Sequence, residues 1–164
     1  MSTIRVFTDG ACSQNPGPGG WAAIFCMPES SESLSGNDTD TTNNRMELTA
    51  VNEAFREIVN AEYKEHTRFE IHSDSAYVVN SINKCWLDGW AKRDWKTSAG
   101  DDVKNIDLWK TCLKLIKRSK ATANVEVVLI KVKGHAGNMF NEMADELAVS
   151  ESMKAKAKLA GGKL

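Results

Sequence analysis

The strongest constraint on the fold is the alternation of short strand-like segments with longer segments of helical periodicity. Residues 3–8 and 20–27 are rich in apolar and β-branched side chains, and Pro-Gly steps lie between them, which favours two strands joined by a turn. Residues 43–60, 103–118 and 141–160 place apolar side chains three or four positions apart, which is the period of an amphipathic helix. The chain is therefore predicted to combine a sheet with long covering helices.

The segments between these elements complete the predicted order. We expect a weak edge strand at 32–35, strands at 68–72 and 125–132, and short helices at 75–82 and 86–90. The 125–132 strand is the most apolar, so we place it at the centre of the sheet. The order is three strands, helix, strand, two helices, strand, helix, which predicts the α/β class with a mixed sheet.

The length of the chain predicts one domain. Its 164 residues are enough to enclose a hydrophobic core, and no repeat or linker divides them. We assign residues 1–150 to a single domain, and residues 151–164 to the end of the last helix and a lysine-rich tail.

The charge and the apolar runs limit the possible partners. A net charge of −1 gives no strong overall attraction to nucleic acid or to an anionic membrane, so local basic groups or metal ions must hold any polyanion. The longest apolar runs, such as 21–27, are too short to cross a bilayer, and we expect no membrane association.

The N-terminus and the cysteines predict a cytoplasmic location. The first residues lack the basic and apolar regions of a secretory signal. The cysteines are widely spaced and form no CxxC pair, so we interpret them as reduced thiols, although four cysteines could form a disulfide framework. They are Cys12, Cys26, Cys85 and Cys112.

Two acidic residues stand where strands end. Asp9 ends the first strand and Asp74 follows the strand at 68–72, and the carboxyl ends of strands line the functional crevice of an open α/β sheet. Two carboxylates ~4 Å apart repel by about 4 kcal/mol at an effective dielectric constant near 20. Such a pair needs protons or a cation, and Mg²⁺ is the natural choice because it binds carboxylate oxygens while keeping water and phosphate ligands.

Two further acids and one histidine extend this hypothesis. Glu47 lies in the first turns of a helix, where it could also serve only as a favourable charge. Asp145 lies on a helix face with apolar neighbours, where an unpaired acid is costly. His135 lies between glycines in a loop; it suits proton transfer, but it could equally be a solvated side chain. The prediction of a site depends on the acids taken together.

The motifs that carry these residues resemble one family. In order along the chain they are TDGACSQNPGPGGWAA, TTNNRMEL, SDSAYVVNSI, WAKRDWKTSAGDDVKNIDLW and VKGHAGNMFNEMADELA. Together, over about residues 3–150, they resemble type 1 ribonuclease H, the bacterial HI and eukaryotic H1 group. The resemblance implies a ribonuclease H-like α/β fold, with a mixed five-stranded sheet flanked by helices and a protruding handle at about 84–104. It also implies endonucleolytic cleavage of the RNA strand of an RNA/DNA hybrid, leaving 5′-phosphate and 3′-hydroxyl ends.

The same resemblance implies the catalytic roles. The metal-binding acids are Asp9, Glu47, Asp74 and Asp145, and His135 corresponds to a mobile histidine that assists proton transfer or product release. Two Mg²⁺ ions, or Mn²⁺ in their place, would lie ~4 Å apart and serve the entering and leaving oxygens. Asp9 is the candidate to bridge them.

Substrate binding is implied for two further groups of residues. The edge expected to face the RNA minor groove comprises Cys12, Gln14, Asn15, Asn43 and Asn44, and only RNA offers it a 2′-hydroxyl. Asn15 could instead be only a turn residue, and the other two asparagines could cap the following helix. Thr42 and Asn105 match a pocket that holds a phosphate of the DNA strand.

The handle is expected to hold the DNA strand through aromatic faces and cations. Its residues for this role are Trp86, Trp90, Trp95, Lys92, Arg93 and Lys96. The alternative is that the tryptophans belong to the core, which we expect for at least one of them.

The chain departs from the family pattern at three places. Asp40 stands where many members carry an arginine in the phosphate pocket, and Ala76 replaces a longer side chain near the second strand-end acid. The handle also contains several acids. We predict weaker hybrid affinity than in a strongly basic relative, with intact chemistry. The acids of the handle are Asp88, Asp94, Asp101 and Asp102.

Other functions were weighed against hybrid cleavage. A DNA-processing nuclease such as an integrase or resolvase would share the acidic cluster but not the NNRMEL, GHAG and handle combination. A catalytically weak or inactive hybrid-binding module would not need all the acids and the histidine. A globular interaction protein with chance motifs would not carry five motifs in order. We expect a monomer without an obligate protein partner.

Overall fold

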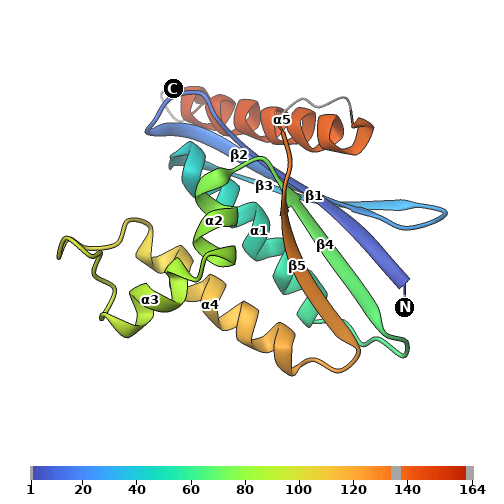
Figure 1. Cartoon of the computed structure of the whole chain (residues 1–164). Helices are drawn as coiled ribbons and strands as arrows, with labels where there is room; N and C mark the ends of the chain where they lie inside the picture. Colours follow the sequence, from blue (N-terminus) through green and yellow to red (C-terminus); the bar gives the residue numbers. More distant parts are fainter. Residues whose placement is uncertain (1, 134–137, 162–164) are drawn as a thin grey trace.

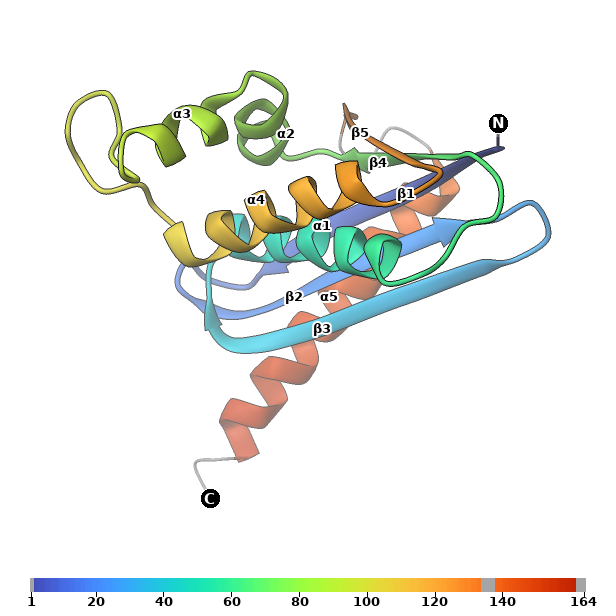
Figure 2. The same cartoon turned by 90° about the horizontal axis from the view of Figure 1, so that it is seen from below.

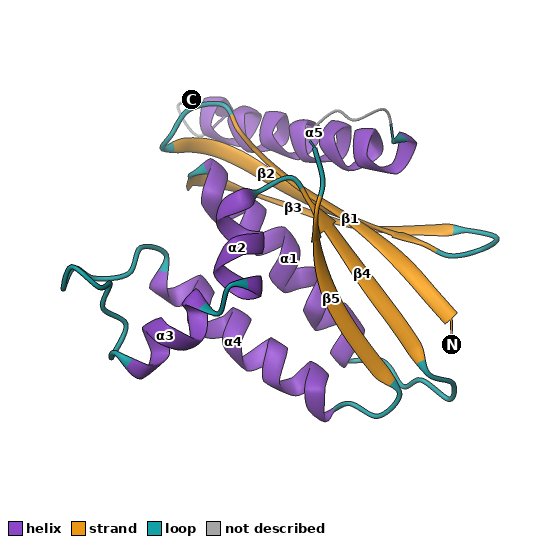
Figure 3. Cartoon of the chain, viewed as in Figure 1, coloured by secondary structure: helices purple, strands orange, loops and turns teal. Residues whose placement is uncertain are grey.

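The computed structural model describes residues 2–133 and 138–161. Its centre is a five-stranded mixed sheet with the order β3-β2-β1-β4-β5 (Figure 3). β1, β2 and β3 pair antiparallel, whereas β1, β4 and β5 run parallel to one another. The strands are β1 (Ser2–Cys12), β2 (Gly17–Cys26), β3 (Ser31–Thr41), β4 (Thr67–Ser73) and β5 (Val125–Lys131). The predicted α/β class with a mixed sheet is confirmed.

Helices cover the two faces of the sheet unequally. α5 (Met139–Gly161) lies alone on one face, and the other four helices lie on the opposite side (Figures 1 and 2). Those four are α1 (Asn43–Val59), α2 (Ala76–Asn83), α3 (Trp86–Lys92) and α4 (Ile106–Ala121). In Figure 1, α3 and the chain that follows it project from the body of the molecule, as expected for a handle.

The main core fills the space between the sheet and α1. Val6 and Ile71 on the sheet, Leu48 and Phe55 on α1, and Trp109 on α4 are almost completely buried. Each of these side chains contributes about 1.5–3 kcal/mol through removal from water. The apolar positions that gave 43–60 and 103–118 their helical periodicity therefore form the buried faces of α1 and α4.

Gly20 allows α5 to lie very close to the other face of the sheet. A Cβ atom at Gly20 would come within 2.4 Å of the carbonyl oxygen of Ala148 and within 2.5 Å of the backbone nitrogen of Ser152. Real Cβ atoms do not approach other atoms so closely, so the helix backbone rests directly on β2. This contact fixes the position of α5, which carries Asp145.

Three sequence-based expectations about the elements were wrong. β3 is a full strand of 11 residues rather than a short one; its polar composition fits an edge, where one side faces solvent. β5 is the other edge rather than the centre, because its apolar side chains meet α4 and not a further strand. α4 begins at Ile106, since Asn105 adopts a left-handed conformation with φ of 59°, which interrupts the helix predicted from residue 103.

Among the residues that the structure describes, no helix combines the length and the apolar character needed to span a membrane.

Candidate active site

The parallel pairing of β1 and β4 brings two acids to the same edge. Phe7 lies opposite His72 in this pairing, so two residues further on, Asp9 and Asp74 are carried to neighbouring positions. Asp9 is still within β1, where it lies opposite Ala22 of β2 and is only 6% exposed. The two acids meet as predicted, but only Asp74 follows the end of its strand; Asp9 was expected to end β1, and β1 instead continues to Cys12.

Glu47 joins them because α1 closes tightly on β1 at Gly10. A Cβ atom at Gly10 would lie 2.4 Å from the backbone nitrogen of Glu47, so a glycine is required at this approach. The helix start is fixed by Thr42, whose hydroxyl accepts a hydrogen bond of 3.2 Å from the backbone N–H of Arg45. The Glu47 side chain is thereby buried, and its Oε2 finds no hydrogen-bond partner among the described residues.

The three acids form a compact cluster. One carboxylate oxygen from each of Asp9, Glu47 and Asp74 lies within 4.8 Å of the others. Burial and the nearby charge of Asp74 raise the pKa of Asp9 to about 7. Burial, followed by the charge of Asp9, raises the pKa of Glu47 well above its usual value. Several hard oxygens with an unpartnered one among them fit a divalent cation such as Mg²⁺.

The fourth predicted acid approaches from the other side of the sheet. Asp145 lies on α5, is partly exposed, and comes close enough to Asp9 to contribute to its raised pKa. It is not among the three acids whose oxygens lie mutually within 4.8 Å. His135 falls outside the described residues.

Comparison with known proteins shows the family of this chain. The family model of RNase H matches residues 1–153. A ribonuclease H of Caldicellulosiruptor saccharolyticus is 45% identical over 150 residues, covering 92% of this chain and 96% of its own. A ribonuclease H of Chlorobium luteolum is 48% identical over 145 residues, covering 88% and 92%. The chain belongs to the ribonuclease H family.

Solved structures agree with this assignment. LC9-RNase H1, described as a type 1 RNase H with the type 2 active-site motif, superposes with a TM-score of 0.72 at 30% identity, covering 94% of this chain and 74% of that one. LC11-RNase H1 in complex with RNA/DNA hybrid superposes with a TM-score of 0.64 at 21% identity, covering 93% and 98%, which shows the shared fold. The ribonuclease H-like fold predicted from the motifs is thus confirmed.

The edge expected to face RNA is built from the β1–β2 turn and the start of α1. The side-chain oxygen of Asn15 accepts a hydrogen bond of 2.8 Å from the backbone N–H of Asn43, which ties the two segments together. The Cys12 thiol donates to the carbonyl oxygen of Gln14 at 2.7 Å. Gln14, Asn15, Asn43 and Asn44 are all exposed. Asn15 therefore has the structural role of a turn residue, which was the alternative to RNA binding, and it is nevertheless exposed.

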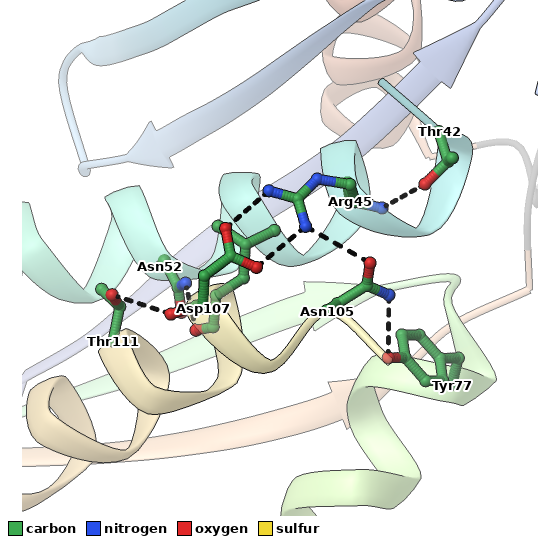
Figure 4. A network of polar contacts seen from close by, with 8 residues as sticks. Thr42, Arg45, Asn52, Tyr77, Asn105, Asp107 and Thr111 are labelled. Carbon is green, nitrogen blue, oxygen red and sulfur yellow. Dashed lines mark hydrogen bonds and ion pairs between the residues drawn. The ribbon is translucent and has the colours of Figure 1, made fainter. Parts of the chain in front are cut away.

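A polar network that the sequence did not indicate links this edge to α4 (Figure 4). The guanidinium of Arg45 donates to both carboxylate oxygens of Asp107, at 2.7 and 3.0 Å, and to the side-chain oxygen of Asn105 at 3.4 Å. Hydrogen bonds from Arg45 lower the pKa of Asp107. Arg45 lies inside the NNRMEL motif, which was the available signal, but nothing in the sequence indicated its partner on α4.

The network continues into the core through Tyr77. The amide of Asn105 donates to the Tyr77 hydroxyl at 3.1 Å, and the indole N–H of Trp109 donates to the same oxygen at 2.7 Å. Asn105, predicted to bind a DNA phosphate, therefore already uses one of its two amide N–H groups and its oxygen. The structure holds Asn105 in place between Arg45 and Tyr77.

The predicted handle residues divide into two groups. Trp90 is partly buried against the core, and its ring meets that of Trp109 edge-on with centroids 5.5 Å apart. Trp86 is 44% exposed, and Lys92 and Arg93 are exposed and form no ion pair within the described part of the chain. Trp90 thus has the core role expected of at least one tryptophan.

The remaining handle cation is neutralised locally. Lys96 forms an ion pair with Asp102, and the same two residues form an isolated backbone bridge. The ion pair accounts for the raised pKa of Lys96. One of the three cations assigned to the DNA strand is therefore partnered by an acid of the handle.

Proposed function

We propose that this ribonuclease H hydrolyses the RNA strand of RNA/DNA hybrids with Mg²⁺ held by Asp9, Glu47 and Asp74, and with Asp145 completing the site. The observation that carries the proposal is the buried three-acid cluster with an unpartnered Glu47 oxygen. Burial without a partner is unfavourable for a carboxylate, so the arrangement is stable as an ion-binding site rather than as a set of surface charges.

Each part of the site would have a distinct task. Bound divalent cations supply charge neutralisation and a water molecule that is easily deprotonated. Asp9 is held in β1 and lies between Glu47 of α1 and Asp145 of α5, so it would be the central ligand of the bound cations. His135 would transfer a proton at the leaving oxygen or assist product release. The products would carry 5′-phosphate and 3′-hydroxyl ends.

Selection of RNA would take place at the edge beside the acids. Cys12, Gln14, Asn15, Asn43 and Asn44 present short polar side chains and backbone groups there, and the 2′-hydroxyl can both donate and accept hydrogen bonds. On the DNA side, Trp86 would line the channel for the strand, and Lys92 and Arg93 would contact its phosphates. LC11-RNase H1, which shares the fold, has been solved with an RNA/DNA hybrid, which supports a hybrid as the substrate.

The departures from the family pattern support weaker binding of the hybrid. Asp40 is exposed, and its backbone N–H donates to the side chain of Asp38, so a second acid lies beside the expected phosphate pocket. Ala76 offers little reach, and Lys96 is already paired. We expect intact chemistry, because none of these residues belongs to the acidic cluster.

Free cysteines support action in a reducing compartment. Cys12, Cys26, Cys85 and Cys112 are all free thiols, which agrees with a cytoplasmic enzyme. We further propose that the enzyme acts as a monomer.

A panel of substrates tests the proposal. The protein is incubated with Mg²⁺ and matched RNA/DNA hybrid, double-stranded RNA, double-stranded DNA and single-stranded RNA. We expect cleavage of the hybrid alone, in its RNA strand, and no cleavage in EDTA. Cleavage of double-stranded DNA would favour a DNA-processing nuclease, and binding of the hybrid without cleavage would favour a binding module; either result would refute the proposal.

A further inference from the structure

The second half of α5 lies beside the turn that is expected to face RNA. A hollow of about 210 Å³ is lined by Cys12 and Ser13 on one side, and by Val149, Met153 and Lys156 of α5 on the other. The last helix therefore reaches the substrate edge, although its only predicted functional residue was Asp145.

Packing and hydrogen bonds hold this part of α5 against the sheet. Ala148 and Ala155 are completely buried, and the hydroxyl of Ser152 donates to the carbonyl oxygen of Pro18 at 3.1 Å. The Glu151 carboxylate, which is 6% exposed, accepts a hydrogen bond of 2.7 Å from the side chain of Asn37. Contacts on three sides thus hold the helix beside the turn.

The lysines on this half of α5 differ in their partners. Lys154 pairs with Glu151 at 2.9 Å, and Lys158 donates to the side-chain oxygen of Asn37 at 2.9 Å. Lys156 is exposed and makes no hydrogen bond or ion pair to any described residue. Of the three lysines, only Lys156 lines the hollow, and it has no protein partner in the described structure.

We propose that Lys156 and the hollow beside it form an additional binding site for the sugar–phosphate backbone of the RNA strand, next to the Cys12–Asn15 turn. This inference rests on the proposed function. Cys12 lies three residues beyond Asp9 in β1, which places it ~10 Å from the acids, so the hollow meets the strand a short distance from the cleavage site. Val149 and Met153, which are 42% and 66% exposed, contact the ribose face, and Lys156 contacts a phosphate.

The site contributes affinity without reading sequence. A lysine that neutralises one phosphate releases its counterions, so its removal reduces the salt dependence of binding by about 0.7–0.9 in the slope of log K against log salt. The contribution compensates in part for the acids near the phosphate pocket and in the handle. It belongs to the RNA side of the hybrid, whereas the handle belongs to the DNA side.

A matched pair of charge reversals tests the proposal. Lys156→Glu is compared with Lys64→Glu, which changes the net charge equally. Lys64 is exposed and precedes β4 at its starting end, whereas Asp74 follows the other end, ~20 Å away or more. Both variants, and Lys156→Arg, are prepared in the full-length chain, with and without Asp74→Asn to prevent cleavage, and their thermal unfolding is recorded as a control for folding.

The readouts are the Kd for a 20-base-pair hybrid at several salt concentrations and kcat/KM for cleavage. We expect Lys156→Glu to weaken binding about tenfold at low salt and to reduce the salt slope, with kcat nearly unchanged. Lys156→Arg retains binding, and Lys64→Glu changes it less than twofold. Shortening the hybrid on the side that reaches α5 removes the difference between the native chain and Lys156→Glu.

Two results would overturn the inference in different ways. Equal effects of the two reversals, with normal cleavage of the hybrid by the native chain, would remove Lys156 from the interface and leave the proposed function intact. Failure of the native chain to cleave the hybrid would refute the proposed function, and the additional site with it.

Discussion

Replacement of Asp9 by asparagine tests two separate effects of this acid: its contribution to catalysis and its cost to the stability of the fold. Carboxylate oxygens of Asp9, Glu47 and Asp74 lie within 4.8 Å of one another, and one such pair of charges repels by about 3.5 kcal/mol at an effective dielectric constant near 20. The pKa of Asp9 rises from 3.8 to about 7, first through burial and then through the charge of Asp74; at ~1.4 kcal/mol per pKa unit, burial and repulsion together correspond to about 4 kcal/mol.

The expected gain in stability is smaller than either value. Protonation relieves part of the repulsion at neutral pH, and Glu47 remains buried in the variant. The backbone N–H of Gly10 donates to Asp9 Oδ1 at 2.9 Å, and the asparagine oxygen can accept the same bond. Without metal, we therefore expect Asp9→Asn to raise the free energy of unfolding by about 1–3 kcal/mol and to abolish cleavage.

The pH dependence has a definite sign. Because the folded state holds the Asp9 proton more tightly than the unfolded state, the native protein loses stability as the pH rises from about 4 to the folded pKa of about 7. The variant lacks this loss. Its advantage in EDTA should grow between pH 4 and pH 7 and then become constant.

Urea unfolding in EDTA at pH 4.5, 6 and 8, repeated in Mg²⁺, measures these differences. In Mg²⁺ the native protein gains stability by preferential binding to the folded state, by about 1.4 kcal/mol at a tenfold excess over Kd, and the variant gains less. A variant that is less stable than the native protein at every pH in EDTA, or one that still cleaves the hybrid, would refute this account of the cluster.

Three further substitutions have expected outcomes. Burial alone would raise the pKa of Glu151, but hydrogen bonds, the first from Asn37, hold it below its usual value; Glu151→Gln should therefore cost about 1–2 kcal/mol at pH 7, and urea unfolding should show the cost shrinking as the pH falls below about 4. Asp107→Ala should cost less than about 1 kcal/mol and, by freeing Arg45 beside the phosphate pocket, tighten hybrid binding at low salt; weaker binding in a titration would contradict this. His135→Ala should slow multiple turnover by about a hundredfold, and a completely inactive variant would assign it a more central role.

The sequence allowed the acids to be predicted because each has a local signature. Asp74 follows a strand and Asp9 closes the apolar part of another, although β1 continues beyond it to Cys12; the α/β order favours pairing of those strands, so their meeting could be anticipated. Arg45 on α1 and Asp107 on α4 are 62 positions apart in the sequence, so no local pattern predicts their contact. The strand at 125–132 was predicted at the centre of the sheet and lies at its edge. Its apolar run shows that the strand is buried, but not whether a neighbouring strand or a helix buries it.

The site depends on two close approaches made from opposite faces of the sheet. Gly10 admits α1 with Glu47 against β1, and Gly20 admits α5 with Asp145 against β2. A larger side chain at either position would displace a helix by its overlap with backbone atoms, which cannot rotate away. Catalytic geometry and core packing are therefore coupled at these two glycines. The same coupling explains why α5 can carry both an acid near Asp9 and, about three turns further along, a lysine beside the turn expected to face RNA, since one fixed helix sets the positions of both.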